Sequence, residues 1–295
     1  MLPPRASPFA PVVPMTASRI SPSQTTSVTR RVVVGLLLAV VGLTLVANQW
    51  AFDALVLVLG VLMLYELNAL CEIKGQPLEY QVAMVGVVAY IVLAWFDLLH
   101  KWEGVLLAGI TIASFSIGMY GGEKGYFART AYTLLAVLYI GKLLTYFIFL
   151  RSVPQLGIWW TYDVIVLIAL TDIFGMVVGS LIGRRQLTKI SPKKTVEGSI
   201  GALLIVSVAG AAAAAYIPQL HLLWWQGMVL GATTSIAAQA GDLAESALKR
   251  DAGVKDTGQL IQGHGGVLDR FDSYLFGGMA YFAVLHVIGL LTVTQ

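Results

Sequence analysis

The chain has 295 residues, of which 57% are hydrophobic and only 12% are charged, and its mean hydropathy is +0.78. This composition excludes a soluble globular protein of ordinary type and indicates an all-α, polytopic integral membrane protein. The formal net charge is only +3, and no nucleic-acid partner is expected. The single cysteine, Cys71, excludes an internal disulfide and a multi-cysteine metal site, and it is interpreted as an inert membrane residue.

The N-terminal residues 1–29 contain repeated prolines among Ser and Thr and show no apolar period, which predicts a disordered tail. Arg30 and Arg31 then precede an apolar run, a pattern that a secretory signal would also show. A second apolar run follows directly, so we expect the first run to be retained as a membrane helix. Residues 30–295 are predicted to form one polytopic helical domain.

Apolar runs of the length needed to cross a bilayer predict about nine spans. They cover approximately residues 32–48, 52–70, 81–98, 104–119, 130–150, 162–183, 199–217, 222–247 and 272–292. If Arg30 and Arg31 are cytoplasmic, most basic residues of the connecting loops fall on the same side, as the positive-inside rule requires. The basic loops at 184–198 and 248–271 then face one compartment, so they can form one site.

Two charged residues lie near the middle of predicted spans, where an ionised group needs a partner, water or a metal. Asp172 lies about halfway along its span, and Lys142 lies at a similar depth in the preceding one. One interpretation is a buried Asp172–Lys142 ion pair that fixes helix register. The other is that Asp172 lines a polar cavity. Gly175, Gly179 and Gly183 recur at four-residue spacing and predict a small helix face that permits close packing.

Carboxylates gather where the last two predicted spans meet the loop between them. Asp242 and Glu245 lie near the end of one span, and Asp269 and Asp272 lie where the next begins. Each pair shares a helix face, and two such pairs can hold hard divalent cations through oxygen ligands, as Mg²⁺ with a nucleotide phosphate requires. The alternative is that they only neutralise cations at the membrane surface. Those cations are Lys249, Arg250 and Arg270.

Two loops have the composition of anion-binding segments. In the later loop, Gly263, His264, Gly265 and Gly266 allow several backbone N–H groups to approach a phosphate. His264 is open to three interpretations, as a phosphate donor, an acid or base, or an ordinary loop residue. The earlier loop places two ammonium groups and two hydroxyls before a helix, which suits phosphate or lipid headgroups. These residues are Ser191, Lys193, Lys194 and Thr195.

The stretch from Ser246 to Asp272 resembles the signature S-x-x-K-R-x4-K-D-x-G-x4-G-H-G-G-x-x-D-R-x-D of the phosphatidate cytidylyltransferase, or CDP-diacylglycerol synthase, family. Residues 171–198 also resemble the family's upstream glycine-spaced and S-P-x-K-T-x-E-G elements. The chain departs from the family pattern in having Gln262 where a proline is usual. It also departs around the intramembrane glycines, at Ile173, Phe174 and Met176.

The resemblance implies transfer of a cytidylyl group from CTP to phosphatidate, which gives CDP-diacylglycerol and pyrophosphate in phospholipid biosynthesis. It also implies Mg²⁺, as two metal ions, with Asp242 and Asp269 as the first ligands and Asp272 and Glu245 as further ones. His264 is then a phosphate donor, because a phosphate monoester with a second pKa of about 6 needs no dedicated base. By similarity, the residues that bind or neutralise the two anionic substrates are Ser191, Lys193, Lys194, Thr195, Ser246, Lys249, Arg250, Lys255, Gly263, Gly265, Gly266 and Arg270.

The resemblance also implies a setting and partners. We expect a multi-pass protein of the cell (inner or plasma) membrane, surrounded by bilayer lipid, with its active site facing the cytoplasm and with a homodimer as its oligomeric state. An alternative within the enzyme class is a cytidylyltransferase for an isoprenoid or ether-linked lipid phosphate. An alternative from another class is an anion transporter that uses Asp172 and Lys142 as midplane coupling residues.

Overall fold

The computed structural model describes residues 40, 42–122, 124–258 and 265–291. These residues form helices joined by short loops, with an isolated antiparallel bridge between Gln186 and Thr195. The elements are α2 (Gln49–Ile73), α3 (Tyr80–Trp95), α4 (Leu99–Gly118), η1 (Met119–Gly121), α5 (Tyr126–Ala136), η2 (Val137–Lys142), α6 (Leu143–Arg151), α7 (Gly157–Ile182), α8 (Val196–Tyr216), η3 (Pro218–Leu220), α9 (Trp224–Asp251) and α10 (Leu268–Val287). The predicted all-α class is confirmed.

The helices are those of a polytopic membrane protein. Long apolar helices able to cross a bilayer cover Gln49–Ile73, Tyr126–Arg151, Gly157–Ile182 and Val196–Tyr216. The predicted count of nine spans is not established, because the run expected at 32–48 falls mostly outside the described residues. The predicted boundary at residue 29, between the N-terminal tail and the single helical domain, also falls there, so it stays a prediction.

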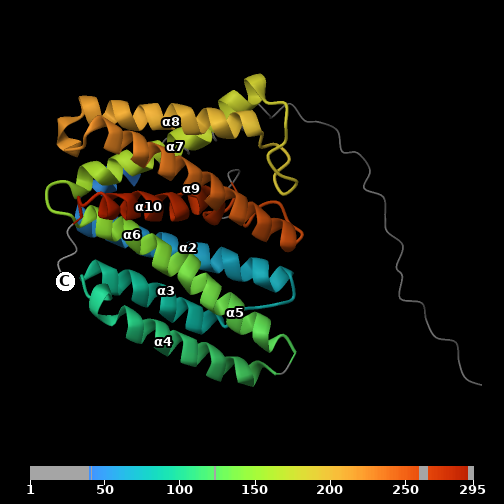
Figure 1. The fold of residues 1–295 in the computed structure, drawn as a ribbon. Coiled ribbons are helices and arrows are strands. Elements are labelled where there is room, and N and C mark those ends of the chain that lie inside the picture. The colour runs from blue at the N-terminus through green and yellow to red at the C-terminus, as the bar shows by residue number, and fades with distance from the viewer. Residues whose placement is uncertain (1–39, 41, 123, 259–264, 292–295) are drawn as a thin grey trace, which may run out of the picture.

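The helices pack in layers, with α10 in the middle (Figure 1). On one side of α10, α9 packs against α8, and α8 packs against α7. On the other side lie α6 and α2, followed by α3 and α4. Because α10 contacts both halves, its N-terminal residues have a fixed place relative to the loops of α7, α8 and α9.

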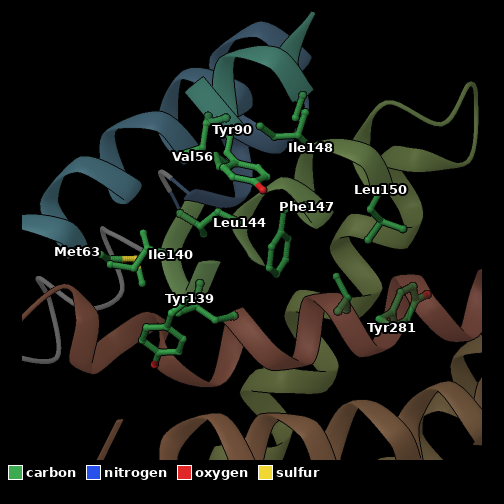
Figure 2. Packing of buried hydrophobic residues seen from close by; sticks show 14 of the residues in the cluster. Val56, Met63, Tyr90, Tyr139, Ile140, Leu144, Phe147, Ile148, Leu150 and Tyr281 are labelled. Carbon is green, nitrogen blue, oxygen red and sulfur yellow. The ribbon is translucent and has the colours of Figure 1, made fainter. Parts of the chain in front are cut away.

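The hydrophobic core joins α10 to α2, α3 and α6. Figure 2 shows Met63, Tyr90, Ile140 and Phe147 converging between these helices, and each is almost or fully buried. Tyr139 in η2, a short π-helical stretch between α5 and α6, packs edge-on against a ring of α10 with 6.1 Å between the centroids. Such close packing resists displacement, so the core holds α10 in position.

Glycines allow α7 and α8 to approach closely, as their four-residue spacing predicts. A Cβ added at Gly198 would lie only 2.6 Å from the carbonyl oxygen of Gly175, and one added at Gly183 would lie 2.6 Å from Thr195 Oγ1. A methyl group does not fit at these distances. The prediction of close helix packing at this glycine face is therefore confirmed.

The prediction of an Asp172–Lys142 ion pair is wrong. The ammonium of Lys142 instead pairs with Glu103 of α4, with 2.5 Å between Nζ and Oε1, and it lies over the ring of Tyr146. Asp172 accepts a hydrogen bond from the hydroxyl of Ser273, with 3.3 Å between the oxygens. The physical reason is the order of the helices, since η2 packs against α3, which in turn packs against α4, whereas α7 packs against α8, α9 and α10.

Candidate active site

A cavity of about 450 Å³ opens among α7, the loop before α8, α9 and the start of α10. Its lining is strongly polar. The acidic residues are Asp172, Asp242, Asp269 and Asp272, and the basic residues are Lys193, Lys194, Lys249 and Arg270. Hydroxyl and amide groups come from Thr171, Ser191, Thr195, Ser199, Gln239 and Ser273. The two basic loop regions therefore line one cavity, as their predicted placement on one side of the membrane allows.

Lys249 of α9 links the end of that helix to α10. Its Nζ lies 2.6 Å from Glu245 Oε2 and 2.7 Å from Asp269 Oδ1. Glu245 lies one helical turn before Lys249, so the two side chains share a face of α9. The side chain of Glu245 is 0% exposed and that of Lys249 is 13% exposed. This largely buried ion-paired group holds the ammonium of Lys249 at the cavity wall.

Asp269, in the first turn of α10, is held by the preceding loop. Its Oδ2 accepts hydrogen bonds from the N–H of Gly266 at 2.7 Å and from the N–H of Thr257 at 3.0 Å. Gly265 has a φ of +86°, a conformation that favours glycine and turns the chain into the helix. Both oxygens of Asp269 therefore have partners within the protein, since Oδ1 contacts Lys249 and Oδ2 contacts the loop.

Three further carboxylates line the cavity. Asp242 forms an ion pair with Lys194 and accepts a hydrogen bond from Ser246 Oγ at 3.4 Å. Asp172 is accessible from the cavity, whereas Asp272 is buried in its wall. The second interpretation of Asp172, as a lining residue of a polar cavity, is confirmed.

The loop before α8 is a tight turn fixed by its own side chains. Glu197 Oε2 accepts hydrogen bonds from the N–H groups of Arg184 at 2.9 Å and Arg185 at 3.2 Å. Thr195 caps α8, because its Oγ1 accepts from the N–H of Gly198 at 3.1 Å. This structure presents Lys194 to the cavity with little freedom for the backbone to move.

Two predicted site residues, Arg250 and Lys255, are not among the residues that line the cavity. Arg250 is exposed and joins the two loop regions through its Nε, which lies 3.4 Å from the carbonyl oxygen of Ile190. Lys255 is exposed beyond the end of α9. Gly263 and His264 lie outside the described residues, so their predicted roles stay predictions.

A divalent metal would meet oxygen ligands at the acidic wall of this cavity. Within the described part of the chain, no group of three or more His, Cys, Asp or Glu side chains forms a ready-made metal site. Mg²⁺ is usually bound by one or two carboxylates together with substrate phosphates, so this donor set fits Mg²⁺ that binds with a nucleotide. Asp242 and Asp272 suit this role better than Glu245 and Asp269, because these two are fixed to the largely buried Lys249, whereas Asp242 pairs with the more exposed Lys194.

Sequence reasoning missed several polar residues inside apolar helices. The amide of Gln239 in α9 binds Ser199 of α8 at the cavity wall. Glu66 of α2 accepts hydrogen bonds from Thr257 and Val267 of the signature loop, which is the segment 252–267 between α9 and α10, and from Leu268 at the start of α10. Glu66 is an ionisable residue in a largely apolar run, which is the signal that would have identified it, whereas Gln239 lies among other polar residues of α9.

A second link outside the cavity joins α2 to α9. Lys74, at the end of α2, forms an ion pair with Asp251 at the end of α9, and its ammonium lies 2.8 Å from the hydroxyl of Tyr132. Hydrogen bonds with Asp251 and Tyr132 raise the pKa of the Lys74 ammonium above its ordinary value. This contact was not predicted from the sequence.

Comparison with known proteins agrees with this geometry. A model of the cytidylyltransferase family matches residues 28–288. A protein of Bacillus subtilis (strain 168) named phosphatidate cytidylyltransferase is 33% identical over 264 residues, which cover 84% of this chain and 93% of that relative. Phosphatidate cytidylyltransferase 5, chloroplastic, of Arabidopsis thaliana is 33% identical over 288 residues, which cover 85% of this chain and 70% of that relative. The chain belongs to the cytidylyltransferase family.

Proposed function

We propose that the protein transfers the cytidylyl group of CTP to phosphatidate and forms CDP-diacylglycerol and pyrophosphate. The observation that carries this proposal is a cavity lined by both carboxylates and ammonium groups, at the polar loops of an apolar helical protein of the cytidylyltransferase family. The names of the relatives in Bacillus subtilis and Arabidopsis thaliana supply the substrate class. A lipid phosphate and a nucleotide triphosphate are both highly anionic, so their joint binding needs this cationic lining.

The reaction exchanges one phosphorus–oxygen bond for another. An oxygen of the phosphatidate phosphate attacks the α-phosphorus of CTP, and the bond from that phosphorus to the bridging oxygen breaks. The electron pair leaves with pyrophosphate. No base has to remove a proton, because a phosphate monoester with a second pKa of about 6 is largely dianionic near neutral pH. The protein must therefore position two anions and stabilise the charge on the leaving group.

The cationic side chains lie where they can perform that task. Lys249, held by Glu245 and Asp269, presents a fixed ammonium at the cavity wall. Lys194 is paired with Asp242, and Lys193 and Arg270 also line the cavity. We assign these cations to the triphosphate and to the lipid phosphate. Mg²⁺, when bound, would neutralise phosphate charge, and Asp242 and Asp272 would hold it.

The site is also proposed to face the cytoplasm of a cell (inner or plasma) membrane. The basic residues of the loop before α8 support this orientation through the positive-inside rule. A cysteine placed at Lys193 in a Cys71→Ser background should react with an impermeant thiol reagent from the cytoplasmic side alone. Labelling from the opposite side alone would refute the orientation. Cross-linking in the membrane tests the predicted homodimer.

Purified protein in detergent or liposomes, given CTP, phosphatidate and Mg²⁺, tests the activity. We expect release of pyrophosphate together with formation of CDP-diacylglycerol. An isoprenoid phosphate offered in place of phosphatidate serves as the control for lipid specificity. If product forms with the isoprenoid phosphate alone, that lipid and not phosphatidate is the substrate. If no lipid phosphate gives product and the protein instead carries anions into liposomes, the proposal is refuted in favour of transport.

A further inference from the structure

Glu66 is a fully buried carboxylate in the apolar helix α2, with 1% of its surface exposed. It is not among the residues that line the cavity. A charged group in such surroundings is strongly unfavourable unless hydrogen bonds or opposite charges satisfy it. Its partners therefore indicate why this position carries a carboxylate.

Within the described part of the chain, its hydrogen-bond partners lie in the signature loop and the first turn of α10. Oε1 accepts a hydrogen bond from the N–H of Val267 at 2.8 Å, and Oε2 accepts one from the N–H of Leu268 at 2.8 Å. Oε2 also accepts from the hydroxyl of Thr257 at 3.0 Å. Both of its oxygens thus bind a segment that is distant in sequence.

Val267 is the N-cap of α10 and Leu268 is its first residue. The first N–H groups of a helix have no partner within the helix, and a negative charge at this end is favourable for the helix dipole. The side chain of Val267 cannot accept a hydrogen bond, so α10 lacks a cap of its own. Glu66 supplies this cap from another helix.

The loop is shaped around this carboxylate. A Cβ added at Gly258 would lie 2.8 Å from Glu66 Oε1, and one added at Gly266 would lie 2.5 Å from Oε2. Side chains at these two positions would collide with Glu66. Two glycines of the signature stretch therefore have a structural role that depends on α2.

The same loop holds the cavity carboxylate Asp269. Thr257 donates its hydroxyl to Glu66 and its N–H to Asp269, and Gly266 donates its N–H to Asp269 while its Cα packs against Glu66. Asp269 in turn binds Lys249 at 2.7 Å. A movement of the loop away from Glu66 would therefore displace Asp269 and, through it, the ammonium of Lys249.

We propose that Glu66 is a positioning residue of the active site, which fixes the start of α10 and the signature loop so that Asp269, Asp272 and Lys249 are aligned for the reaction. The proposal rests on the proposed cytidylyl transfer for its kinetic consequence. Its structural consequence, the anchoring of the loop by α2, is independent of which substrate the cavity binds.

The kinetic test compares Glu66→Gln with the matched control Glu72→Gln. Glu72 lies in the same helix but is exposed, and its carboxylate accepts a hydrogen bond from the neighbouring Asn68 at 2.8 Å. Folded protein is isolated as a sharp size-exclusion peak. The assay then measures kcat, the KM for CTP and the Mg²⁺ concentration that gives the half-maximal rate. Glu66→Gln should lower kcat by about 10- to 100-fold and raise the Mg²⁺ requirement, the range typical for residues behind an active site. Glu72→Gln should match the wild type.

A purely structural Glu66 would lower only the yield or thermal stability. Folded Glu66→Gln protein with the kcat and Mg²⁺ requirement of the wild type would therefore overturn the positioning role. If Glu66→Gln does not fold, Thr257→Val serves as the test variant instead, because it removes one of the three hydrogen bonds to Glu66. The Thr257→Val variant should lower kcat by a smaller factor, and an unchanged kcat would overturn the proposal.

Hydrogen exchange separates this proposal from the proposed function. In Glu66→Gln, or in Thr257→Val, the backbone amides of residues 265–270 should exchange faster than in the wild type, while those of α8 should be unchanged. Unchanged exchange at 265–270 would overturn the anchor even if the enzyme transfers cytidylyl groups. If these amides exchange faster in the variants but the wild-type protein forms no CDP-diacylglycerol, the proposed function is refuted and the anchoring role of Glu66 is retained.

Discussion

Replacing Lys249 with methionine removes the ammonium that two carboxylates share. The Nζ atom lies 2.6 Å from Glu245 and 2.7 Å from Asp269, and the side chains of these carboxylates are 0% and 9% exposed. Methionine keeps most of the volume of lysine but has no charge. The variant would therefore leave two carboxylates close together in a site with little access to water.

The size of the effect follows from this geometry. At 2.7 Å, and with an effective dielectric constant of about 20, one such ion pair has a Coulomb energy of about 6 kcal/mol. Desolvation of the charges offsets much of this energy, so the pair itself stabilises the fold by less. Removing one partner of a buried pair is nevertheless unfavourable by about 3–5 kcal/mol, because the other charge remains buried and unpaired.

Thermal unfolding in detergent, followed by intrinsic fluorescence, measures this effect. We expect Lys249→Met to unfold at a clearly lower temperature than the wild type. The double variant Lys249→Met with Glu245→Gln should recover most of the loss, because it removes the buried charge. Lys193→Met is the control, since Lys193 is exposed and its loss should change stability by less than about 0.5 kcal/mol. A Lys249→Met protein as stable as the wild type, or a double variant no better than the single one, would refute the reasoning.

Two further results are expected. Gly198→Ala would place a methyl group 2.6 Å from the Gly175 carbonyl oxygen, and it should destabilise the protein by about 1–3 kcal/mol in the same assay. The control Gly104→Ala, whose added methyl group has no neighbour within 4 Å, should leave the stability unchanged. Equal stability of the two variants would contradict the close packing of α7 and α8. Removal of divalent metal with EDTA should abolish pyrophosphate release and added Mg²⁺ should restore it, and activity that persists in excess EDTA would contradict the proposed Mg²⁺ dependence.

Much of the candidate site could be predicted because polar residues are rare in this chain. In an apolar sequence, Asp172, Lys194 and Asp242 are recognisable as residues that need water, a partner or a ligand. The counting of spans placed the loops before α8 and α10 on one side of the membrane. The cavity confirms that these two regions meet.

The partners of individual charges could not be predicted, because they depend on which helices are neighbours. Lys142 pairs with Glu103 of α4 because η2 packs against α3, the neighbour of α4, and its depth in the membrane did not indicate this. Glu66 meets Val267 across 201 residues of sequence. The spacing of Glu245 and Lys249 was visible, but it did not show that Glu245 is buried behind the cavity wall rather than open to a metal.

Cytidylyl transfer is proposed to take place in the cavity that Asp242 lines. Its most direct test is the transfer of label from CTP, labelled at the α-phosphorus, to phosphatidate by purified wild-type protein and by folded Asp242→Asn. We expect labelled CDP-diacylglycerol from the wild type and its loss in the variant, since Asp242 is proposed to hold the metal that accompanies the triphosphate. Undiminished transfer by Asp242→Asn, or no labelled lipid from the wild type, would contradict it.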